Sequence, residues 1–205
     1  GDRAGRGPAD APEARLPRQL EDRERIDHPG GDPALHDQVA EQALPVFRNV
    51  LTNLHHLLEK ARADAATRGY DPQVLVSYRL APDMLPFKSQ VFIACDAAKL
   101  CLARLGGLDA PKFDDTENTL EELQGRIQKT LDWLATVPAS AIDGQEAREI
   151  TFPVGKAGTR TMLGEDYLTS WALPNVFFHV TTAYAILRHN GVPLGKRDYL
   201  VGPAA

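Results

Sequence analysis

The chain has 205 residues, of which 43% are apolar and 25% are charged, and its formal net charge is −5. This composition is typical of one globular domain and argues against a fibrous or membrane-embedded protein. An acidic chain lacks the basic surface that would neutralise phosphates or anionic headgroups, so we expect neither a nucleic acid nor a membrane as partner.

The two cysteines, Cys95 and Cys101, lie six residues apart in a segment whose pattern predicts one helix. At that spacing their side chains point to different sides of the helix and cannot form a disulfide with each other. The sequence shows neither an apolar run long enough to cross a bilayer nor a secretory signal. We therefore expect a reduced protein of the cytoplasm.

Residues 1–34 are rich in Pro, Gly, Ala and charged residues and contain few large aliphatic side chains. Such a segment buries too little apolar surface to offset the entropy lost on ordering it. We expect residues 1–34 to form a disordered extension and residues 35–205 to form a single folded domain.

Three long helices are expected in the first part of this domain, because apolar residues recur there at steps of three and four. The first two span about 35–68 and 86–105, and the third is capped by Asp115 or Thr116 and closed by Pro138. Charged residues of the second helix fall off its apolar face, which predicts that they are solvated. These residues are Lys88, Asp96 and Lys99.

Between residues 148 and 163 the apolar period falls to two, and Gly-Lys-Ala-Gly at 155–158 supplies a turn. This pattern predicts a small β-hairpin. A last long helix should begin near Gly164, run through Pro174 and end near residue 190. Together these elements predict an all-α four-helix bundle with a small β-hairpin between the third and fourth long helices.

Two polar side chains, Asn175 and His179, lie one turn apart on an otherwise apolar stripe of the last helix. The stripe comprises Leu168, Trp171, Asn175, His179, Thr182 and Ile186. Both should therefore face the bundle interior, where an unpaired amide or imidazole costs about 1–3 kcal/mol. Three interpretations stay open: a structural pair that fixes helix register, a polar ligand pocket, and a metal site.

The last helix also carries a second apolar line. This line comprises Leu173, Val176, Phe177, Val180, Tyr184 and Leu187. A helix that is apolar on several sides is either central to the fold or covered by a partner. We expect a homodimer, while a cover formed by the hairpin and the C-terminal residues 191–200 would explain the pattern as well.

Four segments resemble the bacterial DUF1993 family of uncharacterised proteins. They are residues 36–61, 79–105, 113–134 and, above all, LPNVFFHVTTAYAILRHNGVPLGKRDYL at 173–200. The resemblance covers about residues 35–201. It extends more distantly to the DinB/YfiT-like helical bundles, many of which are metal-dependent and some of which are thiol-dependent transferases or isomerases. It implies a DinB-like bundle.

The resemblance also implies where a site would lie. DinB-like proteins usually hold a metal with one His on the second long helix and an H-x3-H step on the fourth. In this chain Asn175 takes the first position of that step and His179 the second. Helix register places Gln90 near the position of the remaining His, on the second long helix. Amide oxygens bind zinc and nickel poorly, so we expect no metal, with His179 as the ligand if one is bound.

Two functional hypotheses follow. In the first, a metal-free bundle binds a small molecule in a candidate pocket formed by Asn175, His179, Gln90 and Trp171, or the polar pair simply orders the core. In the second, the protein is a metal- or thiol-dependent transferase or isomerase that uses His179 as ligand or general base. The sequence does not choose between these hypotheses, so whether the protein is an enzyme, and with which cofactor, is left open.

Overall fold

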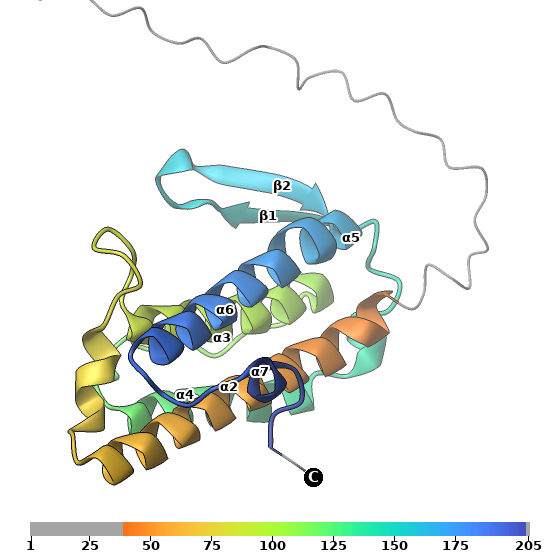
Figure 1. Ribbon diagram of the computed structural model, residues 1–205. Helices are drawn as coiled ribbons and strands as arrows, with labels where there is room; N and C mark the ends of the chain where they lie inside the picture. Colours follow the sequence, from red (N-terminus) through yellow and green to blue (C-terminus); the bar gives the residue numbers. More distant parts are fainter. Residues whose placement is uncertain (1–38, 204–205) are drawn as a thin grey trace, which may run out of the picture. The chain divides into compact units, whose positions relative to one another are not determined.

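The computed structural model describes residues 39–203, so the expected extension at 1–34 lies outside the described residues. Within this range the chain forms four long helices, several short helical turns and one antiparallel strand pair (Figure 1). The long helices are α2 (Val39–Arg68), α3 (Phe87–Gly106), α4 (Leu120–Thr136) and α6 (Leu173–His189). This arrangement confirms the expected all-α bundle with a small hairpin.

The four long helices enclose one apolar core. Helix α3 packs against α6 and α4, while α2 packs against α4 and α6. Each helix contributes large, fully buried side chains, among them Phe47, Leu54, Phe87, Leu102, Leu120, Ile127, Val176 and Ile186. Burying one such side chain stabilises a fold by about 1.5–3 kcal/mol, so this shared core is what holds the helices together.

Helix α4 begins at Leu120, later than the predicted cap implies. Thr119 is its N-cap: the Thr119 hydroxyl accepts a hydrogen bond from the Glu122 amide, and the Glu122 carboxylate accepts one from the Thr119 amide, both at 3.1 Å. The prediction of Asp115 or Thr116 as cap is therefore wrong. The reciprocal capping pattern needs an acidic residue three positions after the cap, and Thr119 has one.

The hairpin consists of β1 (Glu149–Pro153) and β2 (Thr159–Leu163) in antiparallel register, as predicted. Phe152 pairs with Arg160. Directly opposed residues point to the same face of a strand pair, and Phe152 is buried, so Arg160 belongs to the face turned toward the helices.

The chain enters α6 through a wider helical turn than the sequence predicts. After α5 (Gly164–Asp166), residues Tyr167–Ala172 form a π-helix, in which the Leu173 amide donates to the Leu168 carbonyl five residues back. A side chain at Gly164 would collide with the Gln145 carbonyl, which explains the glycine at this turn. Because π-helical turns are rare and often occur at functional sites, this segment marks a region of interest.

The second apolar line of α6 is covered largely by the chain itself. Val176, Val180 and Leu187 are buried, and the Tyr184 ring packs edge-on against Tyr199 of α7 (Lys196–Leu200), with 6.1 Å between ring centroids. The alternative cover by C-terminal residues therefore explains much of this line. The homodimer stays a prediction. No helix in the described part of the chain is long and apolar enough to cross a membrane.

Candidate functional site

A buried hydrogen bond joins Gln90 of α3 to His179 of α6. His179 Nδ1 lies 2.7 Å from Gln90 Oε1, and Gln90 Nε2 donates to the Leu85 carbonyl at 2.9 Å. A carbonyl oxygen can only accept, so the Gln90 amide must direct its nitrogen to Leu85 and its oxygen to His179. His179 therefore donates from Nδ1, and its Nε2 carries the lone pair.

This pair lies in an apolar environment. His179 is 9% exposed and Gln90 only 1%, and the Phe178 ring meets the imidazole edge-on at 5.2 Å between centroids. Burial lowers the pKa of His179 from 6.5 to about 4, because the charged form loses its hydration. At neutral pH the imidazole is uncharged, and Gln90 supplies the hydrogen-bond partner that a buried imidazole needs.

Asn175 and Trp171 lie in a different place. They line a groove of about 210 Å³ between α3, the hairpin and the π-helical segment, which we call the hairpin groove. Its other lining residues are Ile93, Asp96, Ala97, Leu100, Arg104, Phe152, Pro153, Tyr167 and Ala172. The structure thus brings the four candidate residues together as two pairs, Gln90 with His179 and Trp171 with Asn175.

Aromatic rings form one wall of the hairpin groove. The Phe152 ring lies 4.7 Å from Tyr167 and 5.0 Å from Trp171 between centroids, and both pairs are tilted. The Arg104 guanidinium donates to the Tyr167 hydroxyl at 2.7 Å and lies 5.7 Å from the Phe152 ring centre. Burial raises the pKa of Tyr167, so the residue stays a neutral phenol and a possible hydrogen-bond donor.

A second and larger hollow adjoins the first across the outer face of α3. It measures about 500 Å³ and shares Asp96, Leu100 and Arg104 with the hairpin groove. Residues 108–114, the loop that follows α3, contribute most of its outer wall, so we call it the loop groove. Arg104 is therefore the cation that both hollows have in common.

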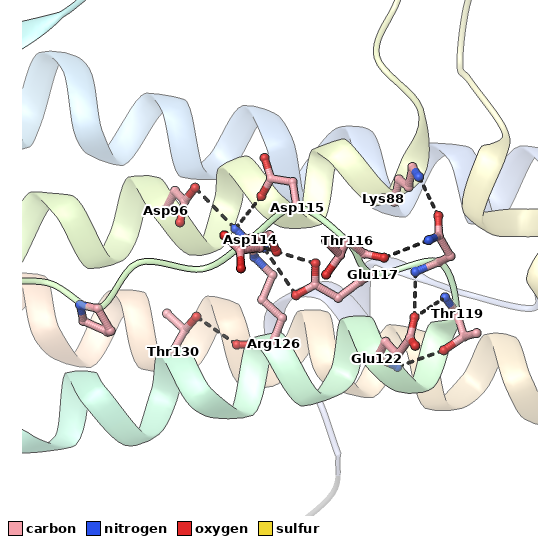
Figure 2. A network of polar contacts seen from close by, with 12 residues as sticks. Lys88, Asp96, Asp114, Asp115, Thr116, Glu117, Thr119, Glu122, Arg126 and Thr130 are labelled. Atoms are coloured by element: carbon pink, nitrogen blue, oxygen red, sulfur yellow. Dashed lines mark hydrogen bonds and ion pairs between the residues drawn. The ribbon is translucent and has the colours of Figure 1, made fainter.

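Arg126 of α4 holds this loop against α3, as Figure 2 shows. Its side chain is fully buried, and its guanidinium lies 3.0 Å from Asp115, 3.3 Å from Glu117 and 3.4 Å from Asp96. It also donates to the Asp114 carbonyl at 3.2 Å. One guanidinium thus links the loop and α3 to α4 through charge-assisted hydrogen bonds.

Lys99 makes a second link between α3 and the loop. It is only 3% exposed, and its Nζ donates to the Pro111 carbonyl at 2.7 Å, lies 3.0 Å from Asp96 and sits over the Phe113 ring. The prediction of a solvated Lys99 is therefore wrong. Helical periodicity correctly excludes it from the apolar core, but the loop folds over that side of α3 and buries it.

The residues around His179 do not fit a zinc or nickel centre. Gln90 Oε1 already accepts the Nδ1 proton of His179, and Asn175 offers only a neutral amide oxygen. These metals prefer imidazole, thiolate and carboxylate ligands. Within the described residues, no group of three His, Cys, Asp or Glu side chains could hold a metal ion. That the protein is metal-free stays a prediction.

Comparison with known proteins places the chain in a family. The model of a domain of unknown function, DUF1993, matches residues 40–200. The chain belongs to the DUF1993 family. This DUF1993 domain is also similar to a DinB family member protein from Shewanella denitrificans, solved by crystallography. The two share 37% identity, with a TM-score of 0.76, over 85% of this chain and 97% of that chain. None of the curated proteins matches this DUF1993 chain.

These findings confirm the resemblance to DUF1993 and the DinB-like fold. The polar groups that shape the two grooves were harder to find from sequence. Arg104 and Tyr167 are 63 positions apart, and no local pattern links them. Arg126 did leave a signal, since it lies next to Ile127 on α4 and one turn from the buried Leu123 and Thr130.

Proposed function

We propose that this DUF1993 domain is a ligand-binding bundle that holds a small organic molecule in the hairpin groove. The observation that carries the proposal is the convergence of Arg104, Tyr167, Trp171 and Asn175 on that groove. Small-molecule sites are typically concave and largely apolar, with a few placed polar groups, and this groove has that composition. The π-helical segment that supplies two of its rings adds support.

In this proposal the Gln90–His179 pair is structural. It joins α3 to α6 in the apolar interior, and its imidazole is neutral and hydrogen-bonded. A hydrogen-bonded polar pair in an apolar interior favours one helix register over its alternatives, because any slip would leave both groups unpaired. The ligand would then be recognised by the neighbouring groove.

Trp171 provides a direct test of the proposal. The chain has two tryptophans, so Trp133→Phe leaves Trp171 as the single fluorescent reporter. We expect members of a library of small organic metabolites to change Trp171 emission, and Asn175→Leu to weaken their binding about fivefold, as expected for one lost hydrogen bond. Emission that no compound changes, or affinities equal in both proteins, would contradict the proposal.

A second candidate function is favoured by one observation. The Nδ1 hydrogen bond to Gln90 leaves the Nε2 lone pair of a neutral His179 available, as a general base requires. The chain would then be a DinB-like transferase or isomerase that takes a low-molecular-weight thiol as co-substrate. In that case His179→Gln would abolish turnover and leave the melting temperature nearly unchanged, whereas a structural pair predicts the reverse.

We also propose that the protein is a homodimer of the cytoplasm, as the sequence predicts. Two phenylalanines of α6 support the dimer, since Phe177 is 38% and Phe178 is 55% exposed. Exposed aromatic side chains are enriched in interfaces between proteins. Light scattering on the full chain would give twice the monomer mass if the proposal is right, and the monomer mass if it is wrong.

A further inference from the structure

We infer that the ligand of the hairpin groove is an organic anion, a carboxylate on a small planar apolar body, whose charged group binds Arg104 and Tyr167. This inference rests on the proposed function and names the chemical class of its ligand. Three sets of observations support it: the charge balance of the groove, the donors that converge in it, and its size and aromatic wall.

The charge balance favours an anion. The ion pairs of residues 43–203 do not include Arg104, whereas Asp96, the carboxylate beside it in the groove, is matched by both Lys99 and Arg126. Arg160 on the inner face of the hairpin lies 5.8 Å from the Trp171 ring, and it too has no ion pair within the described part of the chain. Two unmatched guanidinium groups therefore flank the rings of a protein with a net charge of −5.

Arg104 is not needed to stabilise the end of its own helix. It lies in the last turn of α3, where a cation often interacts with the terminal carbonyls. Here Arg148 serves that end instead, by donating to the Leu105 carbonyl at 3.2 Å. The Arg104 guanidinium is directed to the Tyr167 hydroxyl, so its orientation is set by the groove.

Arg104 and Tyr167 together offer a donor set for a carboxylate. A guanidinium has five N–H groups, and Tyr167 occupies one of them. The Tyr167 oxygen accepts from Arg104, and among residues 43–203 no acceptor takes the hydroxyl proton. That proton can be donated to a ligand. A carboxylate bound by both groups would receive paired guanidinium hydrogen bonds and one from the phenol.

The rest of the groove suits a small flat body. Phe152 and Trp171 present tilted rings, and Ile93, Ala97 and Pro153 add aliphatic surface. The volume of about 210 Å³ is below that of sites for drug-sized ligands, about 300–1,000 Å³, and so fits a single ring with a short acidic side chain. Asn175 can engage a polar substituent on that ring.

The test compares acids with their neutral amides. Benzoate, phenylacetate and 3-phenylpropionate, and the three corresponding amides, are titrated into the full chain by calorimetry at low ionic strength. We expect the best acid to bind at least about tenfold more tightly than its amide, and this preference to shrink as salt is added. Arg104→Gln should remove the preference, and Arg104→Lys should keep part of it. Tyr167→Phe should reduce the preference for acids, because it removes the hydroxyl and keeps the aromatic ring.

Arg188→Gln is the matched control. Arg188 is an exposed arginine of the same chain, about 20 Å along α6 from Asn175 by helix rise. Its replacement should change neither the affinity for the acids nor that for the amides. The anion inference would be overturned if acids and amides bound equally well and Arg104→Gln left their binding unchanged. The proposed function would still stand if Trp171→Leu abolished that binding. Failure of all six compounds to bind at millimolar concentration would overturn the anion inference, and the Trp171 emission screen decides the proposed function separately.

Discussion

At the scale of single residues, the contrast between His179 and Arg104 is the most informative feature of the site. The histidine attracts attention in the sequence because it interrupts an apolar stripe, yet its hydrogen bond to Gln90 and its burial explain its presence without a ligand. The arginine interrupts no stripe, yet it has no ion pair in residues 43–203 and lines both grooves. An unsatisfied charge is better evidence of a ligand than a satisfied polar pair.

The lowered pKa of His179 predicts a pH dependence of stability. Its pKa is about 4 in the folded state, whereas the ordinary value of 6.5 applies in the unfolded state. Between these pH values the unfolded state therefore binds more protons. The stabilising contribution is therefore complete above pH 6.5 and declines as pH falls toward 4, by at most about 1.4 kcal/mol per pH unit.

Urea unfolding of the wild type and of His179→Gln, measured from pH 4 to pH 7.5, checks this prediction. The difference between the two proteins isolates the histidine, because the carboxylates titrate alike in both. We expect the free-energy advantage of the wild type to shrink as the pH is lowered. A difference that stays constant over this range would show that His179 has an ordinary pKa.

At the scale of elements, Arg126 decides how the loop after α3 is placed. Residues 108–114 have no regular secondary structure, and they form the wall of the loop groove because a buried guanidinium binds Asp115 and Glu117 just beyond them. Lys99 adds a second attachment at Pro111. The larger groove therefore depends on two cations that belong to helices and not to the loop itself.

Replacing Arg126 should release this loop. In Arg126→Met the apolar volume is largely kept, but the carboxylates of Asp96, Asp115 and Glu117 lose the cation that they share. Hydrogen exchange should show lost amide protection in residues 108–118, with α6 little changed. Arg188→Met is the control, and equal protection in both variants would contradict the assigned role.

At the scale of the whole molecule, the chain combines a DinB-like fold with two grooves beside α3 and a buried polar pair between α3 and α6. The chain belongs to DUF1993 and is similar over most of its length to a DinB family member protein. Its His179 imidazole is hydrogen-bonded to the Gln90 amide, while Asn175 lines the separate hairpin groove. The fold therefore does not by itself establish the activity.

The metal content of the whole protein tests this view. Untagged protein, purified without chelators from cells grown with zinc, nickel and manganese, should contain far less than one metal ion per chain, and EDTA should leave its melting temperature unchanged. The donors near His179 are too few and too weak to hold such an ion. Near-stoichiometric metal that disappears in His179→Ala would show instead a working metal site.

The period of apolar residues was enough to predict the four long helices and the hairpin, because it reports which face of each element is buried. It also located Asn175 and His179 on one stripe, since that relation is local. The hydrogen-bond and groove partners of these residues follow instead from how the helices pack. Gln90 and His179 are 89 positions apart, and Arg104 and Tyr167 are 63 apart, so their contacts depend on how α3 packs against α6 and on the π-helical turn before it. Local hydrogen bonding and apolar period are encoded within a few residues, whereas the groove exists only where distant elements meet.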